Sequence, residues 1–355
     1  MTSKRVLLAP LDWGLGHAAR CVPIIHELIR QRFTVILAGN GLSLLLLQQE
    51  FPALKSYTLP AYNPIYSESH TQVWKMATQV PKFVSAIVRE QALVDQIAED
   101  EKVDIILSDN RYGCWSTRTK NILITHQLQI LMPPNFTWMS GFVNWVNRKA
   151  IRKFDRCWIP DTVGADNLTG ELSIPFEYPT DFIGPITRLV PNTVAEKKYD
   201  ILILLSGPEP QRSALENLLA KQLADATSQQ IAVIRGTRQA RMISYPSAVT
   251  VVDFASSTRV DEMMAGTTLV IARSGYSTVM DLAALRKKAI FIPTPGQTEQ
   301  EYLAARLEKR GIAGFSAQRD FELLTALKTS NRYSGFTDNI IDPNLLREHV
   351  FRLND

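Results

Sequence analysis

The chain has 355 residues, of which 45% are hydrophobic and 21% charged, a composition typical of a globular protein and a length that favours two domains over one. Its formal net charge of +4 is too small, without a basic cluster, to indicate a nucleic-acid-binding protein. Three cysteines lie far apart without metal-ligand spacing, which fits a reducing cytoplasm: Cys21, Cys114 and Cys157.

The sequence also excludes a membrane-spanning protein, because no apolar run is long enough to cross a bilayer and none opens the chain. We therefore expect a cytoplasmic protein. Short apolar strands alternate with helical segments in both halves, a pattern that predicts an α/β fold with parallel, doubly wound sheets.

The first predicted strand, 6–9, leads through a glycine-containing loop into an amphipathic helix, and 34–38 forms the next strand. Gly14 and Gly16 let a ligand approach the backbone closely. The third glycine of a dinucleotide fingerprint is missing and no acidic residue ends the second strand, which excludes an NAD site. His17 is either a base at a ligand cleft or a hydrogen-bonded histidine without chemistry.

Polar residues follow two further predicted strands, 103–107 and 121–125. Ligands of an open parallel sheet gather at the carboxyl ends of its strands. Four residues in these positions are therefore candidates for binding an acceptor substrate, although a solvated loop explains them equally well: Asp109, Asn110, Arg111 and His126.

The segment 138–156 combines aromatic and basic residues. Trp138, Phe142 and Trp145 share one face of a predicted helix, and five basic residues follow directly: Arg148, Lys149, Arg152, Lys153 and Arg156. One interpretation is peripheral docking on an anionic membrane, with the rings at the level of the headgroups. The other is a core helix with a solvated basic end.

The second half repeats the pattern of the first. Residues 180–191 are read as the crossing into a second domain and 192–199 as a polar linker. Strands are predicted at 200–205, 230–235 and 249–254. We therefore expect a first domain over 1–190 and a second over 191–342.

The stretch 269–305 contains the clearest candidate site. A strand at 269–272 is followed by the turn 274–277 and a helix, an arrangement that presents backbone N–H groups to a phosphate at the positive end of the helix dipole. Asp281 lies about one turn into the helix, where its carboxylate can accept hydrogen bonds from both hydroxyls of a ribose. The alternative is an ordinary strand–helix–strand unit with a serine-capped helix.

This stretch resembles the donor-binding signature of glycosyltransferase family 28, the GT-B family that contains the lipid-II-forming N-acetylglucosaminyltransferase. Asp281 stands where that family has glutamate, and Glu301 and Ala304 depart from its glutamine and asparagine near the sugar. The matching residues are Arg273, Ser274, Gly275, Thr278, Pro293, Gln300 and Ala305.

Two other regions share the resemblance. The segment from Gly14 to Arg20 resembles the G-x-G-H loop of the same family and the G-x-G-H-x-x-R loop of related nucleotide-sugar hydrolases, in which the histidine is a candidate base. Ser206-Gly207 stands where the family has a glycine-serine loop. Asp253-Phe254 stands where a loop of the family presents backbone groups to the nucleotide base.

The resemblance implies a two-domain GT-B fold whose last helix, 343–355, packs back on the first domain. It also implies transfer of a sugar from a nucleoside diphosphate, with UDP as the expected nucleotide, to an acceptor hydroxyl. Lipid-linked molecules are among the acceptors implied. His17 would be the base, and neither a metal nor a cofactor is expected. A nucleotide-sugar hydrolase and a non-catalytic nucleotide-sugar-binding protein remain alternatives. The implied donor-binding residues are Ser206, Gly207, Phe254, Arg273, Ser274, Gly275, Tyr276, Ser277, Thr278, Asp281, Glu299 and Gln300.

Overall fold

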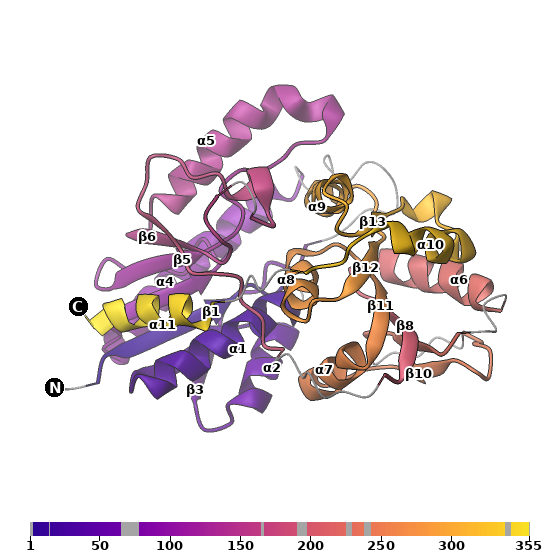
Figure 1. Ribbon diagram of the computed structural model, residues 1–355. Coiled ribbons are helices and arrows are strands. Elements are labelled where there is room, and N and C mark those ends of the chain that lie inside the picture. Colours follow the sequence, from indigo (N-terminus) through magenta and orange to yellow (C-terminus); the bar gives the residue numbers. More distant parts are fainter. Residues whose placement is uncertain are drawn as a thin grey trace. The chain divides into compact units, whose positions relative to one another are not determined.

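The computed structural model describes residues 3–13, 15–64, 78–164, 167–189, 197–224, 229–237, 243–337 and 342–354. The chain forms two compact units, which Figure 1 shows as two separate sheets with their helices. The first unit ends at Arg188 and takes up the chain again from Ile341, and the second begins at Leu189.

The first unit is built on a seven-stranded parallel sheet with the order β3-β2-β1-β4-β5-β6-β7. Its central strands are almost completely buried, as expected for a parallel sheet covered on both faces. The strands are β1 (Arg5–Pro10), β2 (Thr34–Gly39), β3 (Lys55–Thr58), β4 (Ile105–Asp109), β5 (Lys120–Ile124), β6 (Arg156–Ile159) and β7 (Thr180–Phe182).

Helices cover both faces of this sheet, because successive side chains of a strand point to opposite faces. Leu8 of β1 packs toward helix α1, whereas its neighbour Leu7 joins the cluster on the side of helix α4. The helical segments are α1 (Leu15–Arg30), α2 (Gly41–Glu50), α4 (Val80–Asp100), η1 (Pro134–Met139), α5 (Ser140–Ile151), η2 (Gly170–Ser173), α11 (Pro343–Phe351) and η5 (Arg352–Asn354).

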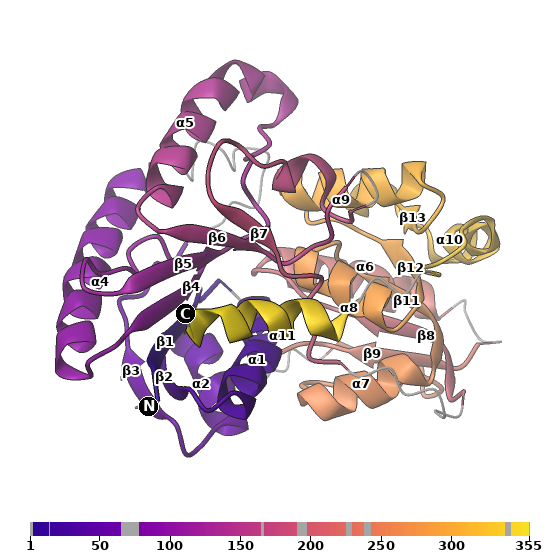
Figure 2. The ribbon, with the colours of Figure 1, turned by 60° about the vertical axis from the view of Figure 1, so that its left-hand side comes forward.

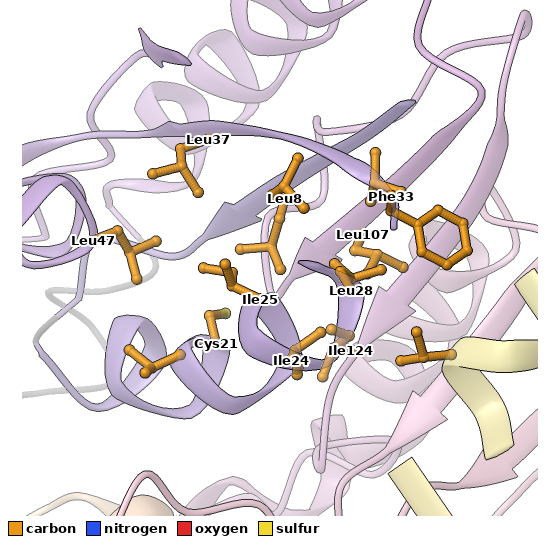
Figure 3. Close-up of a cluster of buried hydrophobic side chains, with 14 of the residues drawn as sticks. Leu8, Cys21, Ile24, Ile25, Leu28, Phe33, Leu37, Leu47, Leu107 and Ile124 are labelled. Carbon is orange, nitrogen blue, oxygen red and sulfur yellow. The ribbon is translucent and has the colours of Figure 1, made fainter. Parts of the chain in front are cut away.

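Helix α1 is fixed to the sheet by an apolar stripe. Cys21, Ile24, Ile25 and Leu28 are fully buried and lie over β1, β2 and β4 (Figure 3). The stripe holds the start of α1 at the carboxyl ends of these strands. The first turn of this helix carries the residues discussed below.

The C-terminal helix α11 packs on the first unit, beside α1 in Figures 1 and 2. Val350 and Leu353 complete the core cluster around α1. Lys4 Nζ donates to the carbonyl of Leu353 at 2.9 Å, and Gln31 Nε2 donates to the carbonyl of Arg347 at 2.9 Å. Residues from both ends of the sequence therefore share one core.

The second unit has a six-stranded parallel sheet with the order β10-β9-β8-β11-β12-β13. Helices α6 and α10 cover one face through a cluster that includes Leu215, Leu219 and Leu323. The strands are β8 (Tyr199–Leu204), β9 (Ile231–Ile234), β10 (Thr250–Val252), β11 (Thr267–Ala272), β12 (Lys288–Phe291) and β13 (Gly314–Phe315). The helical segments are α6 (Gln211–Leu223), α7 (Ser257–Ala265), α8 (Tyr276–Ala284), α9 (Thr298–Lys309), η3 (Gln318–Asp320), α10 (Leu323–Thr329) and η4 (Ser330–Arg332).

The strand order of both sheets is that of the doubly wound nucleotide-binding fold. Three strands were not predicted. No strand is expected from the sequence at 55–58 or 314–315, and 180–182 is expected to be part of a domain crossing, but all three regions form strands at sheet edges. Most of the linker expected over 192–199 lies outside the described residues.

Adjacent residues of α1 test whether its apolar stripe anchors the helix. Leu28→Ala should lower the free energy of unfolding by about 2–5 kcal/mol, because it leaves a cavity in a close-packed core. Ile29→Ala should cost about 0.5 kcal/mol or less, since that side chain is 43% exposed. All six tryptophans lie before residue 189, so urea unfolding followed by tryptophan fluorescence reports on the first unit. Equal losses in the two variants would contradict the packing described.

Candidate functional site

Four polar side chains converge at the carboxyl edge of the first sheet. His17 and Arg20 come from the first turns of α1, Asp109 ends β4, and His126 follows β5. Arg20, Asp109 and His126 are buried, whereas the side chain of His17 is 19% exposed. The structure therefore brings together three candidates from the sequence and one residue, Arg20, that was not among them.

Asp109 and Arg20 form a two-pronged ion pair. Arg20 Nε donates to Asp109 Oδ2 at 2.7 Å, and Arg20 Nη2 donates to Oδ1. His17 Nδ1 lies 3.2 Å from Asp109 Oδ1 and 2.9 Å from Arg20 Nη2. His126 Nδ1 lies 3.4 Å from Arg20 Nη1.

The pair determines the protonation of its neighbours. Burial alone would raise the pKa of Asp109, but the charges of Arg20 and His17 and the hydrogen bonds from both residues together outweigh it and hold that pKa well below its ordinary value. Burial lowers the pKa of His17 below 6.5, and the charge of Arg20 lowers it further against the opposing effect of Asp109. The cluster therefore holds an ionised carboxylate, a guanidinium and an imidazole that stays neutral at neutral pH.

Arg111 does not belong to this cluster, contrary to the expectation for an acceptor-side residue. Its side chain is completely buried, where it forms an ion pair with Glu90 and donates to the carbonyl of Pro60 at 2.7 Å. A cation that is paired in the core and has no exposed surface cannot contact an acceptor. Asn110 adopts a left-handed backbone conformation (φ 55°) and is partly exposed at the strand end.

Gly14 lies outside the described residues. Gly16 is already in the first turn of α1, directly before His17. The loop glycine expected to admit a ligand at this point is therefore a helix residue.

The second unit presents an open helix start at the end of β11. Gly275 is the N-cap of α8, and a Cβ atom built at Gly275 meets nothing within 4 Å. Ser277, Thr278 and Asp281 are partly exposed, whereas the other residues of α8 are buried. They share one face because residues three and four apart are neighbours on a helix. This face carries two hydroxyls and a carboxylate beside the N–H groups of the first turn.

Gly207, which follows β8, the neighbour of β11 in the sheet, lies beside two buried polar atoms. Gly207 has φ 103°, a conformation that favours glycine. A Cβ atom there would lie 3.4 Å from Thr294 Oγ1 and 3.9 Å from Arg273 Nε. Both atoms are buried and have no hydrogen-bond partner among the described residues. A buried polar atom without a partner is costly, and an oxygen-rich ligand that reached these two atoms would satisfy both.

Three residues expected to bind the donor make structural contacts. Arg273 is buried; its guanidinium donates to the carbonyls of Ile292, Pro293 and Gln211 at 2.9 Å each, and its Nε lies near Gly207. The hydroxyl of Ser274 is buried and donates to the carbonyl of Gln300 at 2.7 Å. These bonds join the loops after β11 and β12.

Gln300 is the third such residue. Its Oε1 accepts from the backbone N–H of Thr294 at 2.8 Å, and its Nε2 donates to Gln297 Oε1. Both ends of the amide therefore shape the loop between β12 and α9, and the expectation of direct sugar contact through this side chain is not supported.

The remaining candidates are distributed around this edge of the second sheet. Tyr276 is buried, Ser206 and Glu299 are partly exposed, and Phe254 is 38% exposed after β10, an edge strand. The contacts described above do not connect Phe254 with Gly207 or Gly275.

Helix α5 and the segment η1 before it expose the aromatic residues singled out in the sequence. Trp138, Phe142 and Trp145 are 78%, 64% and 57% exposed, and the helix extends beyond the rest of its unit in Figures 1 and 2. Lys149 Nζ lies 5.0 Å from the centre of the Trp145 ring. The alternative of a core helix is therefore wrong for these three residues, which face solvent.

Sequence reasoning missed Arg20 and Thr294. Arg20 stands three residues after His17, so helical spacing alone places the two on one face. Thr294 lies between two prolines after a strand, and no sequence signal distinguishes it from an ordinary loop residue.

The described residues contain no group of three or more His, Cys, Asp and Glu side chains arranged to hold a metal ion. Within the same residues, no helix combines the length and the apolar character needed to cross a membrane.

Part of the second unit matches a known family. Residues 210–332 match the family 28 glycosyltransferase C-terminal domain. A segment of 79 residues is 38% identical to a UDP-N-acetylglucosamine--N-acetylmuramyl-(pentapeptide) pyrophosphoryl-undecaprenol N-acetylglucosamine transferase of Acidiphilium cryptum, covering 22% of this chain and 20% of that protein. The same enzyme of Methylobacterium radiotolerans is 45% identical over 60 residues, 16% of each chain. The chain therefore matches only about a fifth of the length of these relatives.

Solved structures resemble the chain over its whole length. The glycotransferase of kitacinnamycin has a TM-score of 0.65 at 14% identity, covering 99% of this chain and 94% of that one. MurG of Acinetobacter baumannii has a TM-score of 0.58 at 15% identity, covering 98% and 95%. The calicheamicin glycosyltransferase CalG4 has a TM-score of 0.63 at 14% identity, covering 99% and 93%. At this identity the likeness establishes the fold, which is the GT-B fold predicted from the sequence.

The lowered pKa of His17 predicts a pH dependence of stability. Between its folded pKa and the ordinary value of 6.5, the unfolded chain binds more protons than the folded one. The contribution of His17 is therefore fully present above pH 6.5 and is lost as the pH falls below it. The unfolding free energy of the wild type should decrease more steeply between pH 6.5 and about 5 than that of His17→Gln. His26→Gln, on the exposed side of the same helix, should keep the wild-type slope; a slope unchanged in His17→Gln contradicts the assignment.

Proposed function

We propose that this protein is a glycosyltransferase that moves a sugar from a nucleoside diphosphate, with UDP as the expected nucleotide, to an acceptor hydroxyl. The observation that carries the proposal is the open start of α8 within the segment that matches the family 28 C-terminal domain. Helix N-termini bind phosphate through their free N–H groups and dipole. The alternative that shares this donor site is a nucleotide-sugar hydrolase.

The second unit would hold the donor. The diphosphate lies at Gly275 and beside Gly207, where Arg273 Nε and Thr294 Oγ1 lack partners among the described residues. Asp281, one turn further along the exposed face of α8, accepts hydrogen bonds from the ribose hydroxyls. As the bond between the anomeric carbon and the diphosphate breaks, the N–H groups at the start of α8, Arg273 Nε and the hydroxyl of Thr294 stabilise the negative charge left on the leaving oxygen.

The first unit would supply the base. The acceptor oxygen attacks the anomeric carbon, and its proton passes to Nε2 of His17, the ring nitrogen opposite the Asp109 contact. Neutral imidazole is the form that can take a proton, and the lowered pKa of His17 favours it at neutral pH. Asp109, ionised and buried, stabilises the imidazolium that results. In the hydrolase alternative a water molecule replaces the acceptor.

Asp281 provides the test of the donor site. Asp281→Ala should weaken UDP binding by about 1.5–3 kcal/mol, the value of a hydrogen bond to a charged group, measured by titration calorimetry. The melting temperature should stay close to that of the wild type, because the residue lies on the exposed face of α8. Glu262→Ala, which removes an exposed carboxylate from α7, is the matched control. Equal UDP affinity in wild type and Asp281→Ala would remove this residue from the site.

His17 tests the reaction itself. With a panel of nucleotide sugars and a lipid extract as the source of acceptors, His17→Ala should lower turnover by about 10²–10⁴ and leave UDP affinity within a small factor. His26→Ala, on the same helix, should keep full turnover. Release of free sugar with no acceptor product under any condition would establish the hydrolase instead. Unchanged turnover in His17→Ala would mean that the histidine is structural.

We further propose that the acceptor is lipid-linked and that the protein works in the cytoplasm, on the inner face of the membrane. Exposed tryptophans beside basic side chains are the combination that docks on anionic lipid headgroups. Over η1, α5 and the residues after α5, Trp138 and Trp145 are exposed together with Lys149, Arg152 and Lys153. The relatives named above, which act on a pyrophosphoryl-undecaprenol, support this class of acceptor.

Vesicle binding tests the docking surface. The wild type should co-sediment with phosphatidylglycerol vesicles and be released by salt, which screens charges beyond the Debye length. Replacing Lys149, Arg152 and Lys153 by Gln should weaken binding by about 1 kcal/mol per charge. The control makes the same charge change at exposed lysines of the second unit: Lys221, Lys309 and Lys328. Binding that is indifferent to vesicle charge would exclude this surface as a membrane contact.

A further inference from the structure

The guanidinium of Arg20 contacts both Asp109 and the ring of His17. Its Nη2 donates to Asp109 Oδ1 and also lies 2.9 Å from His17 Nδ1. Guanidinium nitrogens carry hydrogens only, so Arg20 is the donor in both contacts. The second contact therefore requires a lone pair on Nδ1.

Nδ1 of a neutral imidazole either carries the proton or has a lone pair, never both. If Nδ1 accepts from Arg20, the ring proton is on Nε2. If Nδ1 instead donates to Asp109 Oδ1 at 3.2 Å, its hydrogen opposes an N–H of Arg20 at 2.9 Å. The first arrangement has one good hydrogen bond and no opposed hydrogens. The contact distances therefore favour the proton on Nε2.

Asp109 does not reverse this preference, because its carboxylate is already bonded. Arg20 Nε donates to Oδ2 at 2.7 Å while Nη2 donates to Oδ1, and the thiol of Cys21 donates to Oδ2 at 3.5 Å. A carboxylate that is paired with a two-pronged guanidinium draws a further proton less strongly than an unpaired one.

We propose that Arg20 is a positioning residue that holds the free protein in a resting form in which the ring proton of His17 sits on Nε2. The position of the proton is inferred from the contacts alone, and only its consequence for the reaction rests on the proposed function. The charged and titratable groups that act on His17 are Arg20 from the same helix, Asp109 from the end of β4 and His126 from the loop after β5.

The resting form cannot act as a base at Nε2, which already carries its proton. The ring becomes basic there only when the proton moves to Nδ1, donates to Asp109 Oδ1, and Arg20 releases Nδ1. A bound acceptor hydroxyl that donates to Nε2 favours this change. A mobile water molecule favours the proton shift more weakly than a bound acceptor. Arg20 therefore suppresses hydrolysis, the step in which water attacks the anomeric carbon, the bond to the diphosphate breaks and the water proton passes to Nε2. Arg20 thereby favours transfer over hydrolysis.

The tautomer is measurable without any substrate. In protein labelled with ¹⁵N-histidine, two-bond proton–nitrogen correlation spectra distinguish a protonated ring nitrogen from one with a lone pair. The sequence has five histidines, and His17→Gln assigns the signal of interest. Because a charge-assisted hydrogen bond favours one tautomer by about tenfold or more, the wild-type ring should be almost entirely protonated at Nε2. A wild-type ring protonated at Nδ1 overturns the proposal.

Arg20→Lys tests the cause. Lysine keeps a positive charge beside Asp109 but lacks the planar fork that reaches two partners at fixed angles. The fraction of His17 protonated at Nδ1 should rise, and free sugar released per transfer event should rise several-fold. Arg30→Lys, which changes an exposed arginine of the same helix paired with Glu27, should alter neither.

An unchanged tautomer in folded Arg20→Lys overturns the role of Arg20. If that variant does not fold, the wild-type spectrum alone decides the proposal. The two proposals fail in different ways. A protein that turns over no nucleotide sugar contradicts the proposed function. The spectrum of His17 in the protein without substrate does not depend on turnover and tests the tautomer alone.

Discussion

The buried pair of Arg20 and Asp109 is the constraint on which the first unit's site depends. Two charges removed from water are tolerated only when their geometry is good and their remaining hydrogen-bonding groups are satisfied. Here the arginine comes from a helix and the aspartate from a strand end, so the pair fixes the start of α1 against β4. His17, one turn before Arg20 on the helix, is placed by the same requirement. Stability of the core and position of the candidate base therefore have one cause.

The two units use one architectural rule for different chemistry. In each, the strands of a parallel sheet end at one edge, and the loops that follow collect polar groups there. In the first unit the collected groups are charged or titratable, and all but His17 are buried. In the second they are a helix start, a glycine with positive φ and two polar atoms without partners among the described residues. The first set is suited to moving a proton and the second to holding an anion.

Most of this could be predicted from the sequence, since central strands are apolar runs and their polar ends are easy to recognise. The short edge strands could not: β3, β7 and β13 have few buried side chains, and edge pairing leaves no regular pattern. Among polar residues at strand ends, no sequence signal separates Asp109, which faces the site, from Arg111, which is paired in the core. The sequence also could not show which face of α5 is covered, because helical spacing identifies the residues on one face but not what that face packs against.

The return of α11 to the first unit has a consequence for biosynthesis. Val350 of α11 and Leu353 of η5 complete the core around α1, yet the second unit lies between them and Arg188 in the chain. A ribosome adding roughly 5–20 residues per second takes roughly 8–30 s to make the intervening stretch. During that interval the first unit lacks part of its core while the second, whose strands form one continuous segment, can fold by itself. The nascent first unit therefore exposes apolar surface of α1 for seconds, a period in which chaperone binding and misfolding compete with completion of the fold.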